Sequence, residues 1–172
     1  MAKAHKKIAI LVEDLYQVLE VWYPYLRLRE SGLEPVLVGT GTKDSYNSRD
    51  GYPAKVHTSI DKIHTKDFDG VIIPGGYAPD ILRRYESVVK FVKDINDQGK
   101  AVGSICHGGW LLVSANIVKG RKATSFFAIK DDLIAAGAKY IDAEVVIDKN
   151  LVTSRKPEDL TAFMVEFIKL LK

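Results

Sequence analysis

The sequence has little cysteine: Cys106 is the single cysteine among 172 residues. One thiol excludes an internal disulfide and a cysteine-rich metal site. A free thiol is typical of the reducing cytoplasm, where we expect the protein to reside. The spacing of His, Asp and Glu suggests no metal site, and neither a phosphate loop nor a dinucleotide fingerprint is present. We therefore expect no metal and no cofactor.

The sequence also lacks a long apolar run and a strong net charge. Its longest apolar runs, such as Ile8–Val12, are far shorter than the ~20 residues that a membrane helix needs. The basic N-terminus leads into one such run and then into Glu13-Asp14, which is not the pattern of a signal peptide. Net charge is +3 and the basic residues form no stripe. We expect neither a membrane nor nucleic acid as a partner.

The sequence does have an ordinary globular composition, with 47% hydrophobic and 27% charged residues, and its length suits a single domain over residues 1–172. We expect strands at Lys7–Val12, Pro35–Gly39, Asp69–Ile73, Ala101–Ile105, Ala123–Ser125, Glu144–Asp148 and Leu151–Ser154. We expect helices at Gln17–Glu30, Ser87–Gln98, His107–Val118, Lys130–Ala136 and Glu158–Lys172, and short antiparallel strands within Asp44–Ile60. Pro24 should kink or break the first helix. This alternation predicts an α/β fold with a mainly parallel central sheet covered on both faces.

The segment around Cys106 carries the clearest chemical signal. An apolar strand runs directly into Cys106 and a helix is expected at once, which is the layout of a nucleophile elbow. Ser104 and Gly108 provide the small neighbours that such a turn needs. The helix dipole should lower the thiol pKa, and the His107 N–H is placed for an oxyanion hole. The alternative is a buried structural cysteine, but the surrounding pattern favours a nucleophile.

Two further segments should reach the same edge of the sheet. Gly75 and Gly76 follow the expected strand Asp69–Ile73, and their backbone can approach a substrate closely and offer amide donors. Glu20 lies among apolar neighbours early in the first helix, so it is either part of a site or points to solvent. If it lies at the site, burial and a nearby thiolate should raise its pKa.

Several other polar residues are interpreted as surface residues. They are His5, His57, His64, Glu144, Asp148, Lys62, Lys66, Lys119, Arg121 and Lys122.

With these residues in view, the chain resembles the PfpI family of intracellular cysteine proteases. That family belongs to the class I glutamine amidotransferase-like superfamily, which includes the Parkinsonism-associated deglycase. The resemblance covers nearly the whole chain and is carried by Glu20 with Tyr23-Pro24-Tyr25, Pro74–Asp80, Ser104–Gly108, Gly120-Arg121-Lys122, Thr124-Ser125, Ile129–Asp132, Asp142–Val146, Thr153-Ser154-Arg155, Pro157 and Asp159-Leu160. It implies a flavodoxin-like three-layer sandwich with Cys106 as the nucleophile.

The resemblance also implies roles for particular residues. Glu20 matches the carboxylate near the nucleophile, and Asp80 matches the acid that completes a Cys–His–acid arrangement across a subunit contact. This implies self-association as a dimer or hexamer. The family's archaeal proteases have Glu at the position of Asp80 and a glutamate at the position of Gln17. Alternatively, Asp80 is the N-cap of a helix containing Ile81–Tyr85.

His107 needs an orienting group because adjacent side chains on a helix do not face each other. Three functions remain open at this point. The preferred one is a cysteine hydrolase acting on peptide or small acyl substrates, with Cys106, His107, Glu20 and Asp80 as catalytic residues and the N–H groups of Gly76 and His107 holding the oxyanion. The second is a glyoxalase or deglycase acting on methylglyoxal-type aldehydes. The third is a redox-sensing stress protein that uses Cys106 oxidation.

Overall fold

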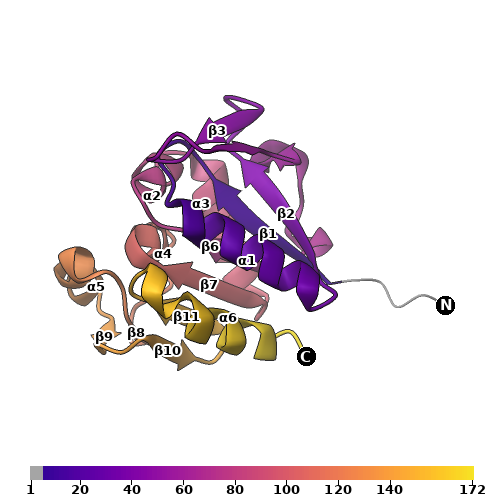
Figure 1. Cartoon of the computed structure of the whole chain (residues 1–172). Helices are drawn as coiled ribbons and strands as arrows, with labels where there is room; N and C mark the ends of the chain where they lie inside the picture. The colour runs from indigo at the N-terminus through magenta and orange to yellow at the C-terminus, as the bar shows by residue number, and fades with distance from the viewer. Residues whose placement is uncertain (1–5) are drawn as a thin grey trace.

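The computed structural model describes residues 6–172 and is built around one seven-stranded sheet (Figure 1). In spatial order the strands are β10 (Val145–Asp148), β11 (Leu151–Ser154), β7 (Ala101–Ile105), β6 (Gly70–Ile73), β1 (Lys7–Val12), β2 (Glu34–Gly39) and β5 (Thr58–Ser59). Neighbouring strands pair in parallel, except in the β10–β11 hairpin. The predicted α/β class with a mainly parallel sheet is confirmed.

Helices cover both faces of this sheet. They are α1 (Val18–Glu30), α2 (Ala78–Leu82), α3 (Glu86–Asp97), α4 (Gly109–Ser114), α5 (Lys130–Ala135) and α6 (Leu160–Lys169). Helices α1 and α6 pack side by side on one face, while α3 and α4 pack on the other (Figure 1). The central strands are buried on both faces, and their continuous apolar runs, such as those of β1 and β6, reflect this.

The order of the strands places a crevice between β1 and β6. From β1 the chain crosses through α1 to β2 on one side, whereas from β6 it crosses through α3 to β7 on the other side. Right-handed crossovers in opposite directions put their helices on opposite faces, so the loops after β1 and β6 diverge. In open α/β sheets ligands bind at this switch point, beyond the carboxyl ends of the strands.

Two small sheets lie outside the main one. Strands β3 (Ser45–Asn47) and β4 (Pro53–Lys55) form the antiparallel pair that was expected within Asp44–Ile60. Strand β8 (Lys122–Ala123) pairs with β9 (Lys139–Tyr140), a strand that was not expected from the sequence. This pair lies beside α5 at one end of the molecule (Figure 1). Within the described part of the chain, no helix has the length and apolar character needed to cross a membrane.

Several sequence expectations are corrected by the structure. Helix α1 continues through Pro24 without a break. The helix expected at His107–Val118 is shorter, because a 3-10 turn, η3 (Cys106–Gly108), precedes α4. The other 3-10 turns are η1 (Ile60–Lys62), η2 (Thr65–Asp67), η4 (Phe127–Ile129) and η5 (Pro157–Asp159).

Arg121 is not a solvated surface residue. Its side chain is only 16% exposed, and its guanidinium donates to the Asp148 backbone oxygen and to the side chains of Asn96 and Asn150. Asp148 is also largely covered, at 18%, and accepts from the backbone N–H of Lys122. The guanidinium therefore ties the β10–β11 hairpin to the end of α3. His57 and His64 are exposed, as expected, whereas His5 lies outside the described residues.

Candidate functional site

Cys106 occupies a strained turn as the first residue of η3, directly after β7. Its φ is 60°, in a region that costs a non-glycine residue roughly 1–3 kcal/mol. The turn is tight on the inner side, because a Cβ on Gly108 would lie 2.5 Å from the Ile73 backbone oxygen and 2.8 Å from Ser104 Oγ. The predicted nucleophile elbow, with small residues at positions 104 and 108, matches this geometry.

Glu20 lies beneath the thiol and is completely buried. Its Oε2 accepts a 2.6 Å hydrogen bond from the backbone N–H of Gly75, whereas its Oε1 has no hydrogen-bond partner among the described residues. Gly75 lies between the Cys106 thiol and the Glu20 carboxyl with almost no free space, because an added Cβ would lie 2.7 Å from both Cys106 Cβ and Glu20 Oε2. The solvent-facing alternative for Glu20 is therefore wrong.

Burial raises the pKa of both Glu20 and Cys106. Burial raises the pKa of Glu20 to about 7, although hydrogen bonds from Gly75 and Cys106 act to lower that pKa. Burial, and then the charge of Glu20, raise the pKa of Cys106 to about 12. The raised pKa of Glu20 was predicted, but the lowered pKa of Cys106 was not found. The thiol is 8% exposed and precedes only one 3-10 turn and a six-residue helix, so desolvation outweighs the helix dipole.

His107 turns back toward the thiol despite being its neighbour in sequence. Its Nδ1 lies 3.3 Å from Cys106 Sγ, and the ring packs against Trp110 and Phe126. The unusual φ of Cys106 removes the helical geometry that would separate the two side chains. Burial lowers the pKa of His107, so the imidazole is neutral near pH 7 and able to accept a proton.

Two backbone amides act on the sulfur. The N–H groups of His107 and Gly76 both lower the pKa of Cys106 through hydrogen bonding. Gly76 has a φ of 77°, and a Cβ there would lie 2.6 Å from the Gln17 backbone nitrogen, so only glycine suits this approach. Gly75, also expected to be an oxyanion or substrate donor, instead donates its N–H to Glu20.

Asp80 does not meet His107 within the chain. It lies inside α2, whose N-cap is Tyr77, so the N-cap alternative is wrong. Its carboxylate pairs with Arg84, and the charge of Arg84 and the Tyr77 hydroxyl hold the pKa of Asp80 below its usual value against the effect of burial. An orienting contact to His107 would have to come from another subunit.

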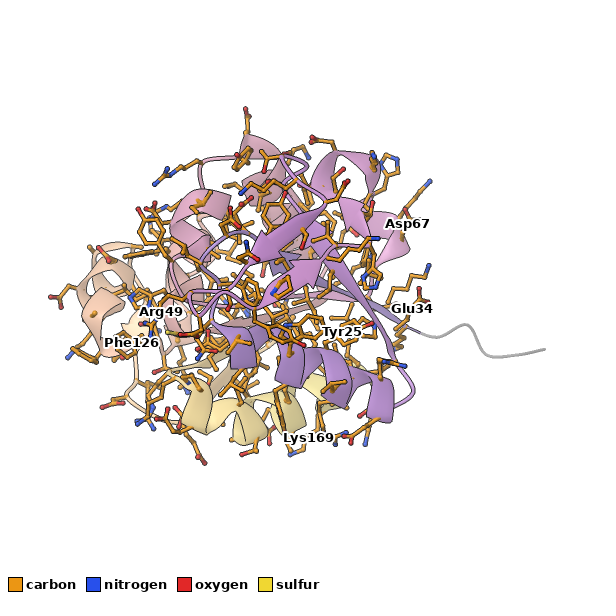
Figure 2. The ribbon with its side chains drawn as sticks, turned by 45° about the horizontal axis from the view of Figure 1, so that its top comes forward. Tyr25, Glu34, Arg49, Asp67, Phe126 and Lys169 are labelled. Carbon is orange, nitrogen blue, oxygen red and sulfur yellow. The ribbon has the colours of Figure 1, made fainter. Side chains whose placement is uncertain are left out.

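These groups open onto a pocket of about 430 Å³. It is lined by Gln17, Glu20, Arg49, Gly76, Tyr77, Cys106, His107, Trp110, Phe126 and Pro157. The residues come from the segments that follow β1, β3, β6, β7, β8 and β11, including the first turns of α1 and α4. Figure 2 labels Arg49 and Phe126 close together on one side of the molecule. Among residues 6–172, no cluster of three or more His, Cys, Asp or Glu is arranged to hold a metal.

Part of the pocket wall was not predicted from the sequence. Trp110 lies four residues after Cys106, a spacing that puts the two near each other across one helical turn, so this residue carried a usable signal. Arg49 and Phe126 follow short strands far from Cys106 in sequence, and no local pattern marks them.

Comparisons with known proteins agree with this geometry. A family model described as the DJ-1/PfpI family matches residues 6–170. The chain is 43% identical over 166 residues to "Deglycase PfpI" of Pyrococcus furiosus, covering 96% of this chain and 99% of that protein. It is 39% identical over 167 residues to "Putative cysteine protease YraA" of Bacillus subtilis, covering 97% and 99%.

A solved structure gives the same picture of the fold. It is a two-domain protein from Anabaena variabilis with DJ-1/ThiJ/PfpI-like and ferritin-like domains. The two chains superpose with a TM-score of 0.94 at 37% identity, over 96% of this chain and 48% of that one. The elbow, the flavodoxin-like sheet and these matches over nearly the whole chain lead to one assignment: the chain belongs to the DJ-1/PfpI family.

Proposed function

We propose that the protein is a thiol-dependent enzyme of the glyoxalase or deglycase type, acting on small 2-oxoaldehydes or their adducts. The observation that carries this proposal is the buried contact between the Cys106 thiol and a carboxyl whose pKa is about 7. A carboxyl with this pKa exchanges protons readily in both directions at neutral pH. A pocket of about 430 Å³ suits a small carbonyl compound, and the deglycase name of the Pyrococcus furiosus relative supports the choice.

These residues support the following sequence of chemical steps. Cys106 sulfur adds to the aldehyde carbon, while its proton passes through Glu20 to the former carbonyl oxygen, which gives a hemithioacetal. Glu20 then removes the proton from the same carbon and returns it to the neighbouring carbon, while the hydroxyl proton passes to the oxygen on that neighbouring carbon, which leaves the thioester of a 2-hydroxy acid. Water hydrolyses the thioester, releases the acid and restores the thiol. The N–H groups of Gly76 and His107 stabilise the oxygen anions that form.

A second candidate function is a cysteine peptidase. The 3.3 Å approach of His107 Nδ1 to Cys106 Sγ favours it, and the Bacillus subtilis relative is named a putative cysteine protease. Here Cys106 would attack a peptide carbonyl, and His107 would pass the thiol proton to the leaving amine. Within the chain Asp80 pairs with Arg84 and does not meet His107. This second candidate function therefore includes the proposal of a homo-oligomer, in which Asp80 orients His107 across a subunit contact.

Matched variants distinguish the two chemistries. The purified protein, Cys106→Ala, Glu20→Gln and His107→Asn are each given methylglyoxal and a fluorogenic peptide, and lactate and free fluorophore are measured. We expect lactate formation that is lost in Cys106→Ala and falls at least about a hundredfold in Glu20→Gln, because the general base is removed. Peptide cleavage alone, retained in Glu20→Gln and lost in His107→Asn, would reject the aldehyde proposal in favour of the peptidase.

A further inference from the structure

The charges of the pocket are divided unequally. Its floor holds the buried pair Glu20 and Cys106, which share a negative charge once either group loses its proton. Burial keeps His107 neutral near pH 7 by lowering its pKa. Arg49 is the one Lys or Arg among the residues that line the pocket. The cavity therefore has a single permanent positive charge.

The backbone of Arg49 is fixed to the site. Its N–H donates a 3.0 Å hydrogen bond to the Tyr16 backbone oxygen. Tyr16 forms isolated β-bridges to Ser48 on one side and to Gly76 on the other. Arg49 is therefore hydrogen-bonded through its backbone to the same residue that forms a bridge with the proposed oxyanion donor, Gly76.

The turn that carries Arg49 is also well braced. Ser48 is buried, and its hydroxyl accepts from the backbone N–H groups of Asp50 and Tyr52. The Tyr16 hydroxyl donates to the Tyr52 backbone oxygen, and the Trp22 indole packs edge-on against the Tyr52 ring. The backbone of Arg49 is therefore anchored within a braced turn, and its exposed side chain lines the pocket.

The guanidinium of Arg49 has no carboxylate partner among the described residues. No ion pair is formed by Arg49, although ten pairs link other residues of the described chain. Nor is its charge among those that shift the pKa of Glu20 or Cys106, whereas the charge of Glu158 does act on Glu20. The guanidinium thus does not serve to neutralise the reactive pair.

We propose that Arg49 is a specificity residue that binds a carboxylate on the substrate, at the end opposite the reacting aldehyde. This rests on the proposed function and names its substrate class, a 2-oxoaldehyde or adduct that carries a carboxylate. A planar guanidinium matches a carboxylate through two parallel hydrogen bonds. One monovalent cation balances one carboxylate, and the aromatic wall formed by Tyr77, Trp110 and Phe126 accommodates the carbon chain between the two ends.

The kinetic test uses two substrates that differ only in charge. They are 4,5-dioxopentanoate and its neutral amide, and kcat/KM is measured for both with the unchanged protein, Arg49→Gln and Arg49→Lys. We expect the preference for the acid over the amide to fall about five- to tenfold in Arg49→Gln, mainly through KM, and to fall less in Arg49→Lys. Lys55→Gln removes the same charge from the neighbouring strand β4, outside the pocket, and should leave the preference unchanged.

A second test does not need turnover. Cys106 is alkylated with N-iodoacetylglycine and with its neutral amide, which have the same reactive carbon, and the ratio of the two rates is compared among the same variants. We expect the ratio to fall in Arg49→Gln, to be largely kept in Arg49→Lys, and to decline in the unchanged protein as salt is added.

The outcomes separate the two ideas. If neither aldehyde is turned over but the alkylation ratio falls in Arg49→Gln, the proposed function fails and the carboxylate site stands. If aldehydes are turned over and neither preference depends on Arg49, the proposed function stands and this inference is overturned. Equal losses in Arg49→Gln and Lys55→Gln would likewise overturn it, because they would show a general charge effect.

Discussion

Replacing Glu20 by Gln should make the protein more stable at neutral and alkaline pH, even though it removes the proposed general base. In the folded protein the pKa of Glu20 rises from its ordinary value of 4.5 to about 7, with burial as the main cause. A carboxyl with a raised pKa stabilises the fold fully below about pH 4.5, where both states are protonated. That stability is lost as pH rises toward 7, because the unfolded chain ionises freely while the buried carboxyl does not.

The magnitude follows from the two pKa values. Each pKa unit corresponds to 1.36 kcal/mol, so the full loss is about 3 kcal/mol. Glutamine has nearly the same shape, keeps an oxygen for the Gly75 N–H and does not titrate. Most of the change falls between pH 5 and pH 8, so the Tm of Glu20→Gln should gain roughly 5–10 °C on that of the unchanged protein over this interval.

The assay is thermal unfolding of both proteins across this pH range. Only the difference between their Tm values is interpreted, because the lowered pKa of His107 works in the opposite direction and is common to both proteins. Glu30→Gln is the control on the same helix, with a side chain 72% exposed, and its Tm difference should stay nearly flat. A Tm difference for Glu20→Gln that is constant from pH 5 to pH 8, or that favours the unchanged protein at pH 8, would refute the reasoning.

Three further substitutions test other parts of the structure. Gly75→Ala places a Cβ 2.7 Å from Cys106 Cβ, so it should lower the free energy of unfolding by about 1–3 kcal/mol and remove most of the activity. The control Gly99→Ala has open space around it, so it should lower the free energy of unfolding by only about 1 kcal/mol, because of its positive φ, and keep the activity. Asp80→Asn should change the Tm little, because the ion pair of Asp80 with Arg84 is exposed. If Asp80 orients His107 in an oligomer, the same substitution should lower peptide turnover at least about tenfold. Full activity in a protein that light scattering shows to be a monomer would contradict this role. Arg121→Gln should lower the free energy of unfolding, measured in urea, by about 2–4 kcal/mol. The control Lys122→Gln changes an exposed residue and should lower it by about 0.5 kcal/mol or less. Equal losses in the two variants would refute the role of Arg121 in bracing the hairpin.

The parts of the site that sequence predicted are those with local causes. The strand β7 is an unbroken apolar run, and the small residues Ser104 and Gly108 surround Cys106 at the spacing that an elbow requires. The alternation of strands and helices fixes a parallel sheet, and a parallel sheet brings the loops after β1, β6 and β7 to one edge. The meeting of Gly76 and Cys106 therefore followed from periodicity and topology, whereas the pattern around Glu20 left its position open and only the family resemblance placed it near Cys106.

The parts that sequence did not predict depend on contacts between distant segments. The Gly75 N–H was expected to face a substrate, but the side chain of Glu20, 55 residues earlier, takes it instead. The thiol pKa was expected to fall because a dipole is visible in sequence, whereas the depth of burial that raises it is not. Arg121 has the composition of a surface residue, and only the folded positions of Asn96 and Asn150 show that it is enclosed.

The cost of the site is concentrated at one contact. Cys106 is held at a positive φ, and the carboxyl beneath it is buried at the expense of its charged form. Neither feature helps the sheet to form, because glycine would relieve the first and glutamine the second. A strained thiol touching a carboxyl with a pKa near 7 suits the proposed chemistry, in which a proton moves as sulfur forms a bond. The same contact is therefore both a cost to the stability of the fold and the strongest argument for the proposed chemistry at Cys106.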